Sequence, residues 1–263
     1  MQDEFESALN SKQPLAARRE HIPKKLSTFD LLFATLKNRG SVRKFQKKDV
    51  PQQILEKILL AATFAPSAGN FQPWEFIVIK NSEIKKSLAG ACYDQPWLAD
   101  APVIIAVCIN MRLAGSLFGE RGEKLYGIQD TAAAAENMLI AATSLGLGSC
   151  WVGAFSEPGI TVLLEVPQYV RPTALIALGF PAEEPPALRR QALADVVHFE
   201  KFGETPRTIQ SGVRADGGTK IALTNVVNRA DEKLERGWDI VKEKFEEKFS
   251  KDEIEKPRVV REF

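Results

Sequence analysis

The chain has 263 residues, with 35 Lys and Arg against 34 Asp and Glu, so its formal net charge is +1 at pH 7. At roughly 150 residues per domain, this length predicts one large domain or two small ones. The near-neutral balance argues against a nucleic-acid-binding protein and against a polybasic membrane-surface protein. The cysteines Cys92, Cys108 and Cys150 and the two histidines are too scattered for a zinc site or a disulfide framework.

Residues 1–26 are polar and of mixed charge, and we expect them to form an N-terminal arm. They contain no apolar stretch of the kind that forms a secretory signal. No apolar run in the chain reaches the roughly 18 residues that a membrane-spanning helix needs. Together with the scattered cysteines, these features predict a cytoplasmic protein with neither membrane nor nucleic-acid partners.

Two helices are predicted before the first strand. The first begins at Thr28, a residue type suited to an N-cap, and ends near Arg39 and Gly40. The second follows Pro51, which fits the first turn of a helix. Its apolar residues recur at three- and four-residue spacing, namely Ile54, Leu55, Ile58, Leu59 and Ala62. Residues 65–70 (APSAGN) then interrupt regular structure.

The middle of the chain alternates strands and helices. Residues 74–79, 103–109 and 173–178 are predicted strands, and the last two have the continuous apolar composition of strands buried on both faces. Ser82 is expected to cap a short helix that ends at Leu88. Asp130 is expected to begin a helix over residues 131–145, which is alanine-rich and should be buried between layers or subunits. Residues 148–155 return to extended chain.

No dinucleotide-binding loop is predicted. Gly146-x-Gly148-x-x-Trp151 only superficially matches that fingerprint, because it follows a helix, precedes a strand and lacks the third glycine. The alternation of helices and strands without a βαβ signature predicts an α+β fold around one central sheet.

The C-terminal part differs in composition from the rest. Residues 203–218 are a polar linker, and a last amphipathic helix is predicted from Val227 onwards. One face of this helix carries Val227, Ala230, Leu234, Trp238, Val241, Phe245 and Phe249. Such a stripe is costly to leave in water, and it packs either across a partner subunit or on its own subunit. The sequence leaves both open.

The chain is poorly supplied with residues for hydrolysis or metal chemistry, since two histidines leave no Ser/His/Asp or Cys/His set to nominate. Chemistry carried by an organic cofactor is therefore favoured. In residues 39–43, two guanidinium groups flank a hydroxyl and suit a phosphate, although a solvated basic turn has the same composition. The small residues and prolines of residues 66–74 leave the backbone accessible to a flat ring, although a plain loop before a strand has a similar composition. Residues 148–154 offer a backbone N–H at Gly153, or a relaxed strand edge.

Taken together and in order, these stretches resemble the nitroreductase family of flavin mononucleotide (FMN) enzymes. The matching segments are residues 39–45 (RGSVRKF), 65–74 (APSAGNFQPW), 128–138 (IQDTAAAAENM), 146–153 (GLGSCWVG) and 178–185 (LGFPAEEP). Each segment alone is weak evidence for the family, but five such segments in the same order are specific to it. The resemblance covers residues 26–202 and divides the chain into an N-terminal arm (1–26), an FMN domain (27–202) and a linker with the C-terminal helix (203–263).

The resemblance implies an α+β fold with a mostly antiparallel central sheet flanked by helices, and an obligate homodimer that binds FMN at its interface. It also implies the cofactor-binding residues, which are Arg39, Gly40, Ser41, Arg43, Pro66, Ser67, Ala68, Asn70, Gln129, Val152, Gly153, Arg189 and Arg190. Which of Arg189 and Arg190 contacts the phosphate stays open. Gly40 departs from the family pattern, because many members carry an arginine there.

The reaction implied is ping-pong transfer of hydride from NADH or NADPH, through FMN N5, to a small organic oxidant such as a nitroaromatic or a quinone. No protein acid or base is assigned to it. Residues 111–126 are expected to set substrate preference through Phe118, Arg121, Lys124 and Tyr126, or to be only a connecting loop with a short helix. The alternatives are a flavoenzyme of the same fold that performs reductive dehalogenation or flavin cleavage, and a non-catalytic flavin-binding protein.

Overall fold

The computed structural model describes residues 27–185 and 190–204. The helices are α2 (Thr28–Asn38), α3 (Gln52–Thr63), α4 (Ser82–Ala91), α5 (Met111–Arg121), α6 (Gly127–Ser144), α7 (Glu157–Leu163) and α8 (Leu193–Val196). The strands are β1 (Trp74–Ile79), β2 (Val103–Asn110), β3 (Gly148–Val152) and β4 (Val170–Gly179). Three shorter turns are η2 (Ala68–Asn70), η3 (Pro96–Leu98) and the π-helical η4 (Gly122–Tyr126).

The four strands form one sheet in the order β1-β2-β4-β3, and every neighbouring pair is antiparallel. This architecture confirms the predicted α+β class with its antiparallel central sheet. Beyond β3, Ser41 forms a parallel bridge with Ser149, and the Val42 N–H donates to the Ser149 carbonyl at 2.9 Å. The chain that leaves α2 therefore runs along the outer edge of β3.

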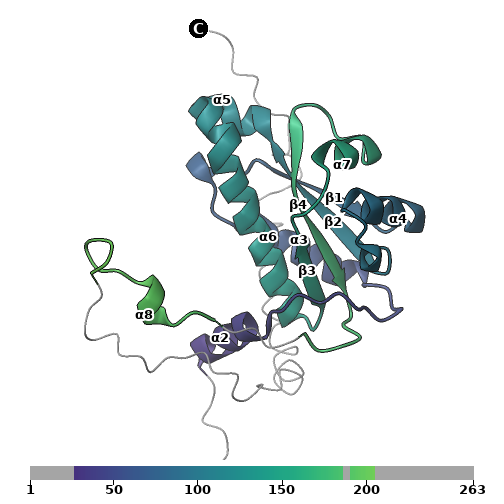
Figure 1. The fold of residues 1–263 in the computed structure, drawn as a ribbon, viewed down its shortest axis with the longest axis horizontal. Helices are drawn as coiled ribbons and strands as arrows, with labels where there is room; N and C mark the ends of the chain where they lie inside the picture. The colour runs from purple at the N-terminus through teal and green to yellow at the C-terminus, as the bar shows by residue number, and fades with distance from the viewer. Residues whose placement is uncertain (1–26, 186–189, 205–263) are drawn as a thin grey trace, which may run out of the picture.

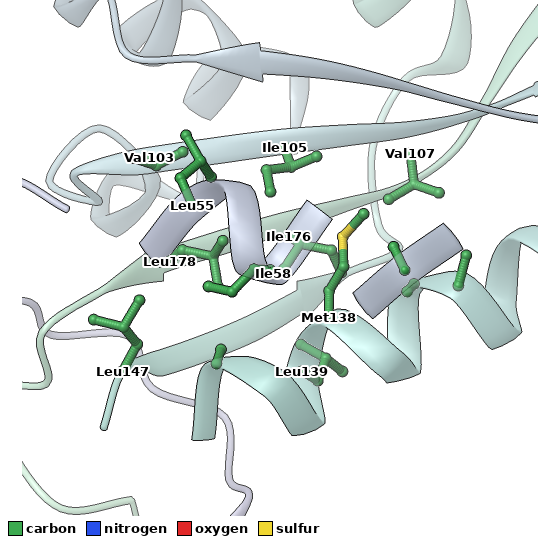
Figure 2. Packing of buried hydrophobic residues seen from close by; sticks show 14 of the residues in the cluster. Leu55, Ile58, Val103, Ile105, Val107, Met138, Leu139, Leu147, Ile176 and Leu178 are labelled. Carbon is green, nitrogen blue, oxygen red and sulfur yellow. The ribbon is translucent and has the colours of Figure 1, made fainter. Parts of the chain in front are cut away.

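Two apolar clusters cover the two faces of the sheet, α6 and α3 lying on one side and α4 and α7 on the other (Figure 1). Figure 2 shows the first cluster, in which Leu55 and Ile58 of α3 and Met138 of α6 pack against β2 and β4. β2 and the end of β4 are buried on both faces, as their apolar runs predict.

Three helix starts differ from prediction. Ser27, not Thr28, caps α2, because its hydroxyl accepts from the Asp30 N–H while the Asp30 carboxylate accepts from the Ser27 N–H, a reciprocal capping box. Asn81, not Ser82, caps α4 through its side-chain oxygen. α6 begins at Gly127, not after Asp130, because it continues from the π-helical turn without needing a cap.

Residues 111–126, for which a connecting loop with a short helix was one expectation, form α5 and η4, with one kink inside α5. The kink lies at Gly119, whose φ of 53° and ψ of −141° are accessible to glycine without strain. α7 is a helix that the sequence patterns did not predict. Residues 1–26 and the helix expected from Val227 lie outside the described residues, so the predicted division into domains stays a prediction.

Candidate functional site

Helix α6 holds the segment that joins α3 to β1. The Ala68 N–H donates to Asp130 Oδ1 at 3.1 Å, and Asn137 Nδ2 donates to the Ala61 carbonyl at 3.1 Å. Asp130 and Asn137 are seven residues apart, which is about two helical turns, so they lie on the same face of α6. One face of α6 thus anchors the end of α3 and the loop that follows it.

This loop, residues 67–72, has an unusual backbone conformation. Gly69, Asn70 and Gln72 all have positive φ values, of 58°, 58° and 52°. For the two residues other than glycine, this conformation costs on the order of 1 kcal/mol each, and such strain clusters at functional sites. The Gln72 N–H closes the loop by donating to Ser67 Oγ at 3.0 Å. Asn70, predicted to bind the flavin ring, is exposed at its tip.

The second candidate segment, residues 39–43, links α2 to the edge of β3. Arg39 follows α2 directly, and its Nε lies 3.4 Å from Glu136 Oε1 on α6. The Arg43 guanidinium lies over the Trp97 ring, 5.7 Å from its centroid. α6 therefore contacts both candidate segments, through Asp130 and Glu136, although these segments are separated by more than twenty residues of sequence.

Two features of the 39–43 segment bear on an anionic ligand. Ser149 lies on β3 and bridges to Ser41. Its Oγ is buried and has no hydrogen-bond partner among the described residues. Leaving a buried hydroxyl unpaired costs about 1–3 kcal/mol, so a polar partner at this edge would stabilise the protein. At Gly40, a Cβ would lie only 2.6 Å from Pro185 Cγ, so a larger residue would require Pro185 to shift.

Three of the four residues predicted to contact substrate come together beside the 67–72 loop. The Phe118 ring packs edge-on against Phe71 of the loop at 6.1 Å and against Tyr126 at 5.1 Å between centroids. Arg121 Nε donates to the Tyr126 hydroxyl at 2.8 Å. Lys124 instead pairs with Glu120 on the exposed side of α5, so the structure does not bring it into this cluster.

The other predicted residues are placed as follows. Gln129 is exposed in the first turn of α6, Val152 is buried at the end of β3, and Gly153 is exposed directly after it. Pro66 is exposed before the 67–72 loop. Arg190 is exposed in the chain before α8, and Arg189 lies outside the described residues.

The described residues offer few alternatives to cofactor chemistry. All three cysteines are buried, and burial raises the pKa of the Cys92 thiol to about 11 and that of Cys108 to about 12. Thiols with such pKa values are poor nucleophiles at neutral pH. No group of three or more His, Cys, Asp or Glu in the described ranges could hold a metal ion. None of the helices in those ranges is long and apolar enough to cross a membrane.

Asp130 and Glu136 contact the candidate segments, yet sequence reasoning did not select either as a site residue. Asp130 was expected only to begin the helix. The available signal was its position in an alanine-rich helix with almost no other charge, where a carboxylate is out of place unless it has a partner.

Comparison with known proteins identifies the family of the chain. The model of the nitroreductase family matches residues 36–100 and 90–180. A relative from Methanothermobacter thermautotrophicus, named as an NADH dehydrogenase/NAD(P)H nitroreductase, is 39% identical over 188 residues, which cover 69% of this chain and 93% of the relative. The Bacillus subtilis FMN reductase (NAD(P)H) is 29% identical over 181 residues, covering 64% of this chain and 73% of the relative.

Solved structures give the same result. The FMN-dependent nitroreductase from Clostridium difficile R20291 aligns with a TM-score of 0.56 at 29% identity, covering 65% of this chain and 99% of that chain. NfrA2 of B. megaterium aligns with a TM-score of 0.62 at 26% identity, covering 68% of this chain and 78% of that chain. The family match spans more than half of the sequence and includes both candidate segments, and the chain belongs to the nitroreductase family.

Proposed function

We propose that this protein is an oxidoreductase that uses FMN to pass hydride from NADH or NADPH to a small organic oxidant. The observation that carries the proposal is the attachment of two distant segments, residues 39–43 and 67–72, to the single helix α6. The names of the relatives support the cofactors, because they include an FMN reductase and an FMN-dependent nitroreductase.

The residues at the site suit FMN chemically. Arg39, Ser41 and Arg43 supply two guanidinium groups and a hydroxyl for the phosphate, and Arg189 or Arg190 adds a further positive charge. The unpaired Ser149 hydroxyl lies at the same edge. Asn70 offers both a donor and an acceptor to the polar edge of a flavin ring, while Pro66, Ser67 and Ala68 leave the backbone accessible. Gln129, Val152 and the Gly153 N–H complete the set.

The chemistry of hydride transfer is supplied by FMN when it is bound, and the protein contributes binding, orientation and charge stabilisation. The arginines of the 39–43 segment hold the phosphate and stabilise negative charge. Asn70 orients the ring through its amide. No side chain is assigned the role of acid or base. As the family resemblance implies, we infer a ping-pong reaction in which the reductant and the oxidant use the same space in turn.

The cluster of Phe118, Arg121 and Tyr126 is proposed to set oxidant preference. Its aromatic rings continue the surface of the 67–72 loop through Phe71 and suit the stacking of a flat substrate. Arg121 retains guanidinium N–H groups besides the Nε–H that it donates to Tyr126, and these favour oxidants with a nitro or carboxylate group. Nitroaromatics and quinones are therefore the oxidants to test.

We further propose that the protein is a homodimer that uses α2. Phe29, Leu32, Phe33 and Leu36 recur on one side of this helix and are all exposed in the single chain, Phe29 to 67%. Contiguous apolar surface of this kind marks an interaction site. A second copy of the chain is the occupant that an FMN site shared between subunits requires.

The proposed activity is tested on the purified protein. We expect it to be yellow, or to become so on adding FMN, and its flavin absorbance to bleach when NADH or NADPH is added without air. Subsequent addition of a quinone or nitroaromatic should restore the colour. Failure to take up FMN would contradict the proposal that FMN is the cofactor. FMN binding without bleaching would indicate a flavin-binding protein that lacks the proposed activity.

A further inference from the structure

Asp130 is a buried carboxylate that the proposed reaction does not use. Asp130 lies on α6 and is only 7% exposed. The other buried residues of α6 are almost all apolar. The neighbouring Thr131 hydroxyl donates within the helix, to the Gly127 and Ile128 carbonyls. Asp130 Oδ1 instead reaches across to the 67–72 loop and accepts the Ala68 N–H at 3.1 Å.

This arrangement is unfavourable for the fold alone. Burial raises the pKa of Asp130, and the Ala68 N–H only partly opposes this rise. An ionised carboxylate in such a place destabilises the folded chain compared with a neutral side chain of the same shape. Buried carboxylates with raised pKa values are found at functional sites, where stability is lost in exchange for function.

The contact with Ala68 affects the whole loop, because the loop is closed on itself. The Asn70 N–H donates to the Ser67 carbonyl at 3.0 Å, and the Gln72 N–H donates to Ser67 Oγ at 3.0 Å. The Phe71 N–H donates to the carbonyl of Ala68 itself at 3.2 Å. A carboxylate that fixes Ala68 therefore fixes the residues with positive φ that follow it, including Asn70.

We propose that Asp130 is a positioning residue for the flavin: its carboxylate fixes Ala68, and thereby holds the 67–72 loop in the strained conformation that presents Asn70. The inference rests on the proposed function, because it assigns the loop to the flavin. It predicts that Asp130 acts on flavin affinity separately from its effect on the stability of the fold.

The test compares Asp130→Ala, which removes the acceptor, with Asp130→Asn, which keeps an acceptor oxygen but removes the charge. Glu83→Gln is the matched control, because it removes a carboxylate charge from the exposed surface of α4. Each flavin-free protein is titrated with FMN, unfolded in urea, and followed by hydrogen exchange at the Ala68 amide. We expect FMN affinity to fall about tenfold or more in Asp130→Ala and less in Asp130→Asn, with faster exchange at Ala68. Glu83→Gln should match the wild type.

The stability measurement separates positioning from a structural role. We expect the urea midpoints of both Asp130 variants to equal or exceed that of the wild type, since a buried charge is removed. An affinity loss that only follows a loss of global stability would overturn the inference, as would unchanged FMN affinity in Asp130→Ala. If the wild type takes up no FMN, the proposed function fails, and the positioning role of Asp130 fails with it. The exchange rate at Ala68 then reports only whether Asp130 anchors the loop.

Discussion

Among residues 27–185 and 190–204, one charged side chain is buried on each side of the sheet, and the two hold different kinds of backbone group. On the α4 side, Lys85 is 8% exposed and its Nζ donates to the Ala101 carbonyl at 2.6 Å, within the turn that leads into β2. On the α6 side, Asp130 is 7% exposed and accepts from Ala68, in a loop whose tip is exposed. Burial shifts both pKa values toward the neutral form, lowering that of Lys85 and raising that of Asp130.

The difference lies in what each charge holds. Ala101 is completely buried and adjoins the core strand β2, so Lys85 satisfies a backbone carbonyl that water cannot reach. Ala68 belongs to a partly exposed loop with three positive φ values, and it is this loop, not the core, that Asp130 holds. Burial of a charge is therefore not by itself a sign of function, and the group that the charge holds distinguishes the two cases.

The largest effect is expected from Lys85→Ala. It removes the donor to a buried carbonyl and empties space beneath α4, so the free energy of unfolding should fall by about 2–4 kcal/mol in urea titrations. FMN affinity should not change, because Lys85 lies on the face away from α6. Lys86→Ala, on the exposed side of the same helix, is the control and should change little. A loss of FMN affinity without a loss of stability would break the contrast between the two faces.

The second effect is expected from Arg43→Ala. Loss of a hydrogen bond from a guanidinium to the phosphate should weaken FMN binding by about 1.5–3 kcal/mol, or roughly 10- to 150-fold, in fluorescence titrations. Arg112→Ala is a matched control, because Arg112 also lies over an aromatic ring, that of Tyr169, at 4.2 Å. Equal effects of the two substitutions would contradict the assignment of residues 39–43 to the phosphate.

Local patterns predicted the elements of the fold better than their ends. The strand at residues 74–79 was predicted to the residue, because a β-branched and aromatic run between turn signals leaves little choice. Thr28 was wrong as a cap because Ser27 and Asp30 form a capping box, a signal that was present in the sequence. α7 was missed because its seven residues are too few to show a helical period.

The segments of the candidate site could be selected from the sequence, whereas the tertiary contacts of these segments could not. The composition of residues 39–43 and 66–74 suggested phosphate and flat-ring binding, and the structure joins both to α6. That Glu136 would reach Arg39, or that Lys124 would pair with Glu120 away from Phe118, follows from helix rotation and packing. Periodicity alone does not determine either.

The third prediction concerns the proposed dimer. Leu32 on α2 is 51% exposed in the single chain, so covering its remaining surface is worth about 1 kcal/mol per copy. Leu32→Glu should therefore weaken dimerisation at least tenfold in sedimentation experiments, because it also buries a charge. Val162→Glu, at an exposed apolar position on α7, is the control. A dimer that withstands Leu32→Glu would place the interface elsewhere.

A smaller effect is expected at the aromatic cluster. Phe118→Leu keeps an apolar side chain but removes the ring that contacts Phe71 and Tyr126, and should change the relative kcat/KM values for quinones and nitroaromatics by about 1 kcal/mol, or fivefold. FMN affinity should be nearly unchanged. Lys124→Gln serves as the control, since Lys124 faces Glu120. If Lys124→Gln changed oxidant preference more than Phe118→Leu, the preference would lie on the exposed side of α5.

The smallest effect is a difference in the pH dependence of stability between the two buried charges. The folded pKa of Asp130 lies above its ordinary value of 3.8, so the folded state binds more protons than the unfolded state between these two values. The stability that protonated Asp130 contributes is therefore lost as the pH rises through the folded pKa. Because the folded pKa of Lys85 lies below 10.5, the unfolded state binds more protons between those values, and stability rises with pH there.

Each group changes by at most one proton, so neither slope can exceed about 1.4 kcal/mol per pH unit. Urea titrations across pH should show the acidic slope removed in Asp130→Asn and the alkaline slope removed in Lys85→Met, each relative to the wild type. Slopes that survive both substitutions would belong to other titratable groups. In that case the burial of Asp130 and Lys85 would have no effect on the pH dependence of stability. Loss of both slopes with loss of FMN affinity only in Asp130→Asn would show that the same physical burial serves the fold on one face and the ligand on the other.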